Sequence, residues 1–484
     1  MNTDRRILLS GASLATAQEV RQGALLIKGE RIDKIWKVND NGAVDYNGIS
    51  ISPEALTTKI LEDYPDTEVL DVKGNVLMAG GIDAHVHFRE PGMTQKADMN
   101  SESKAALLGG ITSFIDMPNN NPPATSLDRI KEKCRLAEGR CYANWGFHIG
   151  ADNENAEDIS RWTEEDKSMF AGVKVFMGSS TGNMLVDKGN TLEKLFSLKD
   201  ARVLIHSEDE SIIKANLEKA KETTRSGGMP EYLQGSRAHE CIRSRQACIR
   251  STIKALEMAI KYGTKLHVCH VTTAEEVEMI RTAKKYNPEI TAETSANYLW
   301  FCDEDYDRLG SKVKCNPAIK KASDRAALRQ ALKEGVIDTI GSDHAPHLAE
   351  EKNRPYLMCP SGMPSIQQEL SVLLTVADEE KIPLNVIASA MSEKIASMFG
   401  IKGRGALKEG NAADILVIDI DKEFTVGESD MGAAGAAYKC GWTPYEGARL
   451  KGMATDVFLN GKHVVADGQL IEDKPLGKPL FFMA

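Results

Sequence analysis

The feature that most constrains the fold of this chain is a pair of histidines at the end of a short apolar stretch. Residues 76–79 are apolar and run into GGIDAHVHFREPG, in which one residue separates His85 from His87. Residues two apart in an extended chain point to the same face, so both imidazoles can bind one metal ion. A second motif, GSDHAPH, lies far downstream. Two strand-end motifs so far apart fit the first and last strands of one (β/α)8 barrel.

Strand-like and helix-like segments alternate between about residue 79 and residue 400. The predicted strands are the apolar runs 111–117, 173–177, 203–206 and 266–271, and the predicted helices are 127–137 and 249–261. Alternation of this kind predicts a parallel sheet with helices outside it, and the length of the region suits a TIM barrel with insertions.

Strand-like segments with turns also occur near both ends of the chain. Residues 457–465 predict a hairpin that turns at Asn460 and Gly461. The fold class that follows is α/β: a (β/α)8 TIM-like barrel with a small β-sandwich domain built from both chain termini. The predicted ranges are 1–78 for the N-terminal part of the sandwich, 79–405 for the barrel, and 406–484 for the C-terminal part and tail.

Composition narrows the class of protein. A net charge of −10 argues against nucleic-acid binding as the main function, and no apolar run approaches the roughly 18 residues that a membrane span needs. The 9 cysteines include no CxxC pair, which favours reduced thiols in a cytoplasmic protein. Residues 5–17 faintly resemble a signal peptide, but the polar residues within them favour a strand. We therefore expect a cytoplasmic protein that binds neither nucleic acid nor membrane.

Other candidate ligands stand at the ends of apolar runs, where barrel enzymes keep their active sites. His206 ends 203–206, and His270 and Asp343 follow comparable runs. Each also has an ordinary alternative, since a histidine can be a structural core residue and an aspartate can cap a helix. We interpret His148, His239, His267, His344 and His463 as structural.

Lys174 is the unusual residue of the apolar run 173–177. An inward-facing lysine is unfavourable in a barrel unless it is neutralised or paired, and burial lowers its pKa and frees the amine. The amine can then react with CO₂ to form a carbamate, an anion able to bridge two metal ions. The alternative is an outward, solvated lysine.

The sequence is similar to the amidohydrolase superfamily of metal-dependent cyclic amidases, and within it resembles the class I dihydroorotases. The matching stretches occur in the family's order along nearly the whole chain: GGIDAHVHFREPG, GGITSFIDMPNNNP, GVKVFMGSSTGNM, LIHSED, LHVCHVTTAEE, KCNPAIK, GSDHAPH and KEGNAADILVID. Dihydropyrimidinases and allantoinases share the metal ligands, and dihydropyrimidinases also share the lysine.

The resemblance implies two zinc ions per chain, bridged by carbamylated Lys174. One ion would be bound by His85, His87 and Asp343, and the other by His206 and His270. Asp343 would also be the catalytic general base and then acid.

The resemblance also implies substrate contacts. Arg89 would hold a carboxylate, an arrangement that suits the planar guanidinium, and its alternative is a surface salt bridge with Glu90. Asn119 and His347 match the family's other carboxylate contacts, and Asn316 matches its contact to the ring. All three could instead be turn residues beside prolines.

The predicted function is the reversible, zinc-dependent cyclisation of N-carbamoyl-L-aspartate to L-dihydroorotate in de novo pyrimidine biosynthesis. The alternatives are a dihydropyrimidinase or hydantoinase, an allantoinase, and a non-catalytic scaffold homologue. The expected partner is a small-molecule substrate, and the expected assembly is a homo-oligomer, specifically a dimer.

Overall fold

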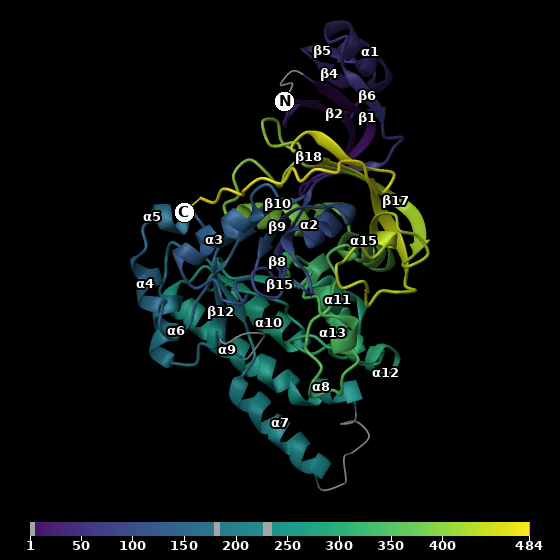
Figure 1. Ribbon diagram of the computed structural model, residues 1–484. Coiled ribbons are helices and arrows are strands. Elements are labelled where there is room, and N and C mark those ends of the chain that lie inside the picture. The colour runs from purple at the N-terminus through teal and green to yellow at the C-terminus, as the bar shows by residue number, and fades with distance from the viewer. Residues whose placement is uncertain (1–4, 179–183, 226–234, 484) are drawn as a thin grey trace.

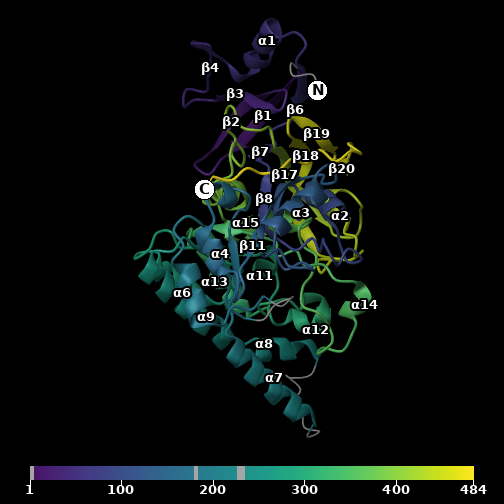
Figure 2. The same ribbon diagram turned by 60° about the vertical axis from the view of Figure 1, so that its left-hand side comes forward.

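The computed structural model describes residues 5–178, 184–225 and 235–483. Figure 1 shows a barrel surrounded by helices, with a β domain at its upper end that contains strands from both termini. Figure 2, turned by 60°, shows the same division. Within the described ranges, no helix is long and apolar enough to cross a bilayer.

The barrel is a closed ring of parallel strands, which confirms the predicted fold class. One sheet has the order β10-β9-β8 and another the order β11 to β16, and β10 and β11 are separated only by His148. A parallel bridge from Val86 to His344 joins the first strand to the end of the last. The strands are β8 (Gly81–Val86), β9 (Ile111–Asp116), β10 (Asn144–Phe147), β11 (Ile149–Gly150), β12 (Val173–Phe176), β13 (Val203–His206), β14 (Leu266–Val268), β15 (Thr291–Thr294) and β16 (Thr339–Ile340).

Helices follow the strands and cover the outside of the barrel (Figure 1). The predicted helix 127–137 is α3, with Ser126 as its N-cap, and the predicted helix 249–261 lies within α9, which ends at a left-handed Gly263. The helices of this region are α2 (Met99–Leu108), α3 (Leu127–Ala137), α4 (Ala156–Arg161), α5 (Glu164–Lys167), α6 (Gly189–Phe196), α7 (Glu210–Arg225), α8 (Ala238–Ile242), α9 (Arg245–Tyr262), α10 (Ala274–Ala283), α11 (Ala296–Trp300), α12 (Asp305–Leu309), α13 (Ala322–Lys333), α14 (Ala349–Lys352), α15 (Glu369–Glu380), α16 (Leu384–Ala388) and α17 (Lys394–Met398).

Strands from both termini form one 9-stranded sheet in the order β20-β19-β18-β17-β7-β1-β2-β3, with β6 paired to β1. The antiparallel pair of β17 and β7 joins the C-terminal strands to the N-terminal ones. A hairpin and one further helix complete this domain. The elements are β1 (Arg6–Ala15), β2 (Val20–Lys28), β3 (Arg31–Lys37), β4 (Val44–Tyr46), β5 (Ile49–Ile51), α1 (Pro53–Asp63), β6 (Glu68–Asp71), β7 (Val76–Ala79), β17 (Ile415–Thr425), β18 (Arg449–Leu459), β19 (Lys462–Ala466) and β20 (Gln469–Leu470).

Alternating side chains give this sheet two buried faces. On β17, Ile415 and Val417 pack in the core of the β domain, whereas Leu416 and Ile418 join the core that includes the barrel. The two-residue period of the strand therefore attaches the β domain to the barrel. The predicted hairpin also forms, and both of its turn residues, Asn460 and Gly461, have positive φ as a type I′ turn requires.

One expectation about the first motif was wrong. The apolar stretch 76–79 is β7 of the terminal sheet, and the histidines lie at the end of a separate strand, β8. Gly80 lies between the two strands, and a Cβ at this position would come within 2.1 Å of the Thr112 Oγ1. The domain boundaries at 78/79 and 405/406 stay predictions.

The connection between the domains yields a stability prediction. The buried Asp414 carboxylate accepts hydrogen bonds from Asn144 Nδ2 at 3.1 Å and from the Asn460 backbone N–H at 2.7 Å, and it pairs with Arg404. Asp414→Ala removes the carboxylate partner of the largely buried Arg404 and the acceptor of the Asn460 N–H, so we expect a loss of about 3 kcal/mol in unfolding free energy. Denaturant unfolding measures it. Asp421→Ala, at an exposed position, is the control and should change stability by less than about 0.5 kcal/mol; equal losses would contradict the prediction.

Candidate metal centre and substrate cleft

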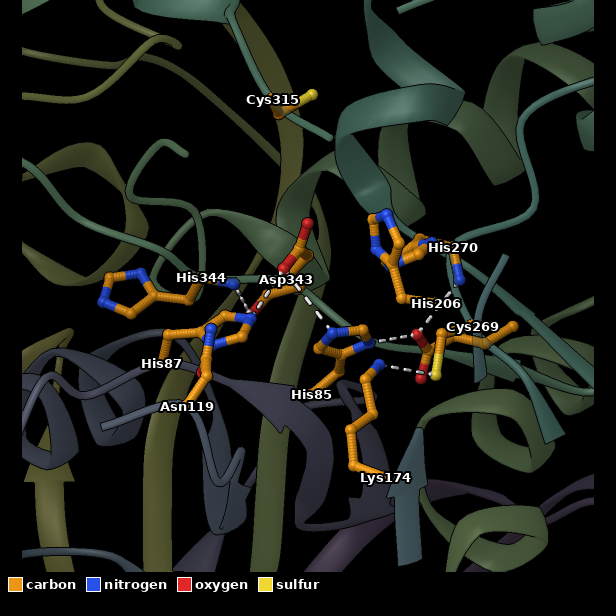
Figure 3. A network of polar contacts seen from close by, with 12 residues as sticks. His85, His87, Asn119, Lys174, His206, Cys269, His270, Cys315, Asp343 and His344 are labelled. Carbon is orange, nitrogen blue, oxygen red and sulfur yellow. Dashed lines mark hydrogen bonds and ion pairs between the residues drawn. The ribbon is translucent and has the colours of Figure 1, made fainter. Parts of the chain in front are cut away.

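The first predicted ligand group converges where the barrel closes. His85 and His87 come from the end of β8, and Asp343 follows β16. Their donor atoms lie within 4.8 Å of one another. The Asp343 Oδ1 is 3.1 Å from His87 Nε2 and 3.6 Å from His85 Nε2, as Figure 3 illustrates. Two imidazoles and one carboxylate at this spacing form a donor set suited to zinc.

The second predicted pair lies beside the first group. The Nδ1 of His206 is 3.0 Å from the Nε2 of His270, and the ring centroids of His270 and His85 are 5.1 Å apart. Among the described residues, the buried Nδ1 of His270 has no hydrogen-bond partner. Burial lowers the pKa of His85, His206 and His270, which leaves neutral imidazoles, the form that binds metal.

Lys174 lies in the interior beside these histidines. Its side chain is fully buried, and its Nζ is 3.2 Å from the Sγ of Cys269 (Figure 3). No carboxylate of the described ranges forms an ion pair with it. The alternative of an outward, solvated lysine was wrong, and the sequence interpretation did not identify Cys269 as its neighbour.

Buried carboxylates that the sequence interpretation missed orient the histidines. Glu293 on β15 accepts a hydrogen bond from His85 Nδ1 at 2.6 Å, and Glu208 contacts His206 Nε2 at 2.8 Å. Burial would raise the pKa of Glu208, but Arg243 and His206 outweigh it and hold this pKa at about 2. Such outer partners fix ring orientation and tautomer. An acidic residue inside a short strand of small and β-branched residues was the available signal for Glu293.

A small cleft opens over the first ligand group. Five of its lining residues are predicted site residues, and a sixth predicted residue, His347, contacts the lining residues Arg89 and Ser361. Asn119 also accepts a hydrogen bond from His87 Nδ1 at 2.7 Å, which was not predicted. The lining residues are His87, Arg89, Asn119, Asn316, Asp343, Ala345, Ser361 and Gly362.

Arg89 is a buried cation in this cleft. Its Nε donates to the Pro346 carbonyl at 3.1 Å, and within the described part of the chain no carboxylate lies within ion-pair distance. Burial lowers its pKa to about 10, so it stays charged at neutral pH. The alternative of a surface salt bridge with Glu90 was wrong, because Glu90 pairs with Arg140 at 2.7 Å.

The neighbouring His347 leaves an Arg89 N–H without an acceptor. Burial, Arg89 and Lys96 hold the pKa of His347 far below its usual value, so the ring is neutral. The Lys96 ammonium has donors and no acceptor, so the Nδ1 of His347, 3.0 Å from Lys96 Nζ, must accept from it. We therefore assign the ring proton to Nε2, which donates to the Ser361 carbonyl at 3.0 Å. Arg89 Nη2, 3.1 Å from the same Nε2, therefore faces a donor. An anion in the cleft would satisfy it.

Comparison with known proteins agrees with this geometry. A profile described as the Amidohydrolase family matches residues 76–464. A curated dihydroorotase from Methanosarcina mazei is 33% identical over 81% of this chain and 84% of that protein, and one from Bacillus subtilis is 30% identical over 90% and 98%. Among solved structures, an L-hydantoinase (dihydropyrimidinase) from Arthrobacter aurescens has a TM-score of 0.85 at 24% identity, covering 98% of this chain and 99% of that one.

The Glu293–His85 contact gives a prediction about metal affinity. Glu293→Gln weakens the acceptor that orients His85, so we expect metal affinity to fall by about 10- to 100-fold. Competition with a chromophoric chelator measures the dissociation constant. Glu276→Gln is the control, since Glu276 is a buried carboxylate that bonds Thr252 and Thr273 instead. An unchanged dissociation constant in Glu293→Gln would refute the orienting role.

Proposed function

This chain belongs to the amidohydrolase family and is a hydrolase of cyclic amide bonds, and from that premise we propose that it is a dihydroorotase. The reaction would interconvert L-dihydroorotate and N-carbamoyl-L-aspartate in pyrimidine synthesis. The observation that carries the proposal is Arg89, a buried cation without a carboxylate partner in the described chain, in a cleft beside the candidate metal ligands. Dihydroorotate has a carboxylate that this guanidinium can bind.

The residues present fit two zinc ions. His85, His87 and Asp343 would hold one ion, and His206 and His270 would hold the other. Among the described residues, the buried Nδ1 of His270 has no hydrogen-bond partner, so it is available as a metal ligand. Lys174 would bridge them as a carbamate, formed when the neutral amine attacks CO₂ and loses a proton. When bound, zinc polarises the amide carbonyl and makes hydroxide available near neutral pH.

The chain's own residues then orient the substrate and move the proton. Arg89, Asn119 and His347 would hold the carboxylate, and Asn316 would contact the ring, which places the scissile bond beside Asp343. Burial would raise the pKa of Asp343, but the hydrogen bond from His87 and the electrostatic effect of His85, His87 and Lys174 lower it overall, so the carboxylate is ionised. An ionised Asp343 can accept a proton and deliver it to the departing ring nitrogen.

A hydantoinase or dihydropyrimidinase is the second candidate. The structural likeness to such enzymes and the lysine at position 174 favour it. Against it stands Arg89, because dihydrouracil and hydantoin offer no carboxylate to pair with a buried guanidinium. An allantoinase ranks third. A non-catalytic scaffold ranks last, since all six ligand positions are filled.

The proposal is tested by assaying cyclisation of N-carbamoyl-L-aspartate, and ring opening of dihydroorotate, with added zinc and bicarbonate. We expect activity in both directions, loss of activity after chelation, and recovery when zinc and bicarbonate are returned. Dihydrouracil, hydantoin and allantoin are assayed in parallel. Turnover of one of these together with no reaction of dihydroorotate would show that the proposed substrate is wrong.

Arg89→Met tests the carboxylate contact. It keeps the length of the side chain but removes the charge, so kcat/KM for dihydroorotate should fall about 100-fold, equivalent to about 2.7 kcal/mol. Steady-state kinetics measure the change, which should appear mainly in KM. Arg281→Met, which removes a surface arginine of α10, is the matched control and should leave kcat/KM unchanged. Wild-type kinetics in Arg89→Met would remove the carboxylate argument.

A further inference from the structure

Arg89 has an unusual backbone. Its φ is +63°, in the left-handed region that residues other than glycine adopt only when their surroundings hold them there. The side chain's position over the cleft depends on this conformation. Two backbone groups therefore matter, the Phe88 N–H and the Glu90 carbonyl, because they belong to the residues immediately before and after Arg89.

A ring of buried side chains binds both groups. The Phe88 N–H donates to Asp116 Oδ1 at 2.7 Å, and Lys133 Nζ donates to Asp116 Oδ2 at 2.5 Å. The same Nζ donates to Asn120 Oδ1 at 2.8 Å, and Asn120 Nδ2 donates to the Glu90 carbonyl at 3.0 Å. These hydrogen bonds link the Phe88 N–H, before Arg89, to the Glu90 carbonyl, after it. The link passes through the side chains of Asp116, Lys133 and Asn120.

Lys133 joins the parts of this ring. It lies on α3 and is 1% exposed, and its third N–H donates to the Met117 carbonyl at 3.1 Å, so all three donors of the ammonium are used. Met117 and Asn120 bracket Asn119, the cleft residue that contacts His87. One ammonium therefore connects the segment that carries Arg89 with the segment that carries Asn119.

The two segments also pack tightly. A Cβ on Gly92 would come within 1.8 Å of the Asn121 carbonyl oxygen, so residue 92 must be glycine for the chains to approach this closely. The members of the ring are buried. In a buried, fully bonded network, loss of one member leaves the others unsatisfied and free to move.

We propose that Lys133, Asp116 and Asn120 are positioning residues that set the specificity of the cleft for carboxylate-bearing ring substrates by fixing Arg89. This inference rests on the proposed function, because it assumes that Arg89 binds the substrate carboxylate. None of the three side chains needs to touch the substrate. Their effect on turnover passes through Arg89, and that dependence can be measured.

The test is a double-mutant cycle with Lys133→Met and Arg89→Met, assayed with dihydroorotate. We expect Lys133→Met alone to raise KM about tenfold with a smaller change in kcat. In the Arg89→Met background, Lys133→Met should change KM by less than about twofold, because the residue through which it acts is already gone. A tenfold effect that persists in that background would overturn the proposal, as would an unchanged KM in Lys133→Met.

Two further variants separate positioning from loss of stability. Asn120→Ala opens the ring without leaving a buried charge unpaired and should raise KM in the same direction. Lys284→Met breaks another Lys–Asp pair, at 2.5 Å with Asp338, and should lower the melting temperature without changing KM. If Lys284→Met raised KM as Lys133→Met does, general destabilisation would explain the effect and the proposal would fail.

A crystal structure of Lys133→Met, or of Asn120→Ala if the first variant does not fold, gives a readout that needs no substrate. We expect the Arg89 φ to leave the left-handed region and the guanidinium to move from the Pro346 carbonyl. An Arg89 that stays in place would overturn the proposal. A wild-type chain without activity on dihydroorotate would refute the proposed function, and the crystal structure would then decide alone whether the ring holds Arg89.

Discussion

The candidate site depends on the closure of the barrel, where the first strand meets the last. Asp83 accepts hydrogen bonds from the backbone N–H groups of His85 at 2.9 Å and Ser342 at 3.2 Å. The His87 N–H donates to the carbonyl of His344 at 2.8 Å. These bonds fix the register of β8 against β16, two strands that are remote in the sequence. The ligands at their ends can then share one metal ion, because the closure has already set the distance between them.

The sequence predicted the parts of the site that follow from local patterns. The strand ends, helix α3 and the turn at Asn460 are encoded by short apolar runs and turn residues. The histidine pair was wrongly placed at the end of the stretch 76–79 because β7 and β8 are both short and only Gly80 separates them, and the partner that distinguishes them, β17, lies far downstream. The supporting carboxylate Glu293 was missed for a related reason, since its role arises only when β15 lies against the end of β8.

Two buried lysines illustrate the limit of sequence patterns more sharply. Lys174 could be recognised because its neighbours on the strand are apolar, whereas Lys133 stands among charged residues of α3 and looks solvated in the sequence. The structure buries both. Lys133 has a carboxylate partner, Asp116, and all three N–H donors of its ammonium are used. Lys174 forms no ion pair with a carboxylate among the described residues, and its Nζ has the thiol of Cys269 as its hydrogen-bond partner there. The presence or absence of a carboxylate partner therefore distinguishes a lysine with a structural role from one that is available to react.

The same distinction applies to the buried guanidinium in the cleft. Arg89 is desolvated, and its one nearby imidazole presents a donor, so part of the penalty for burying its charge is not recovered within the described protein. A substrate carboxylate would recover it, whereas a neutral ring of the same shape would displace water from the cation and offer no charge in return. Sites built around a buried polar group reject analogues that lack its partner more strongly than apolar pockets reject analogues that lack a methylene. Selectivity for an acidic substrate therefore arises less from added attraction than from the free-energy penalty of leaving Arg89 without an anionic partner. It also requires a backbone that keeps the guanidinium in the cleft.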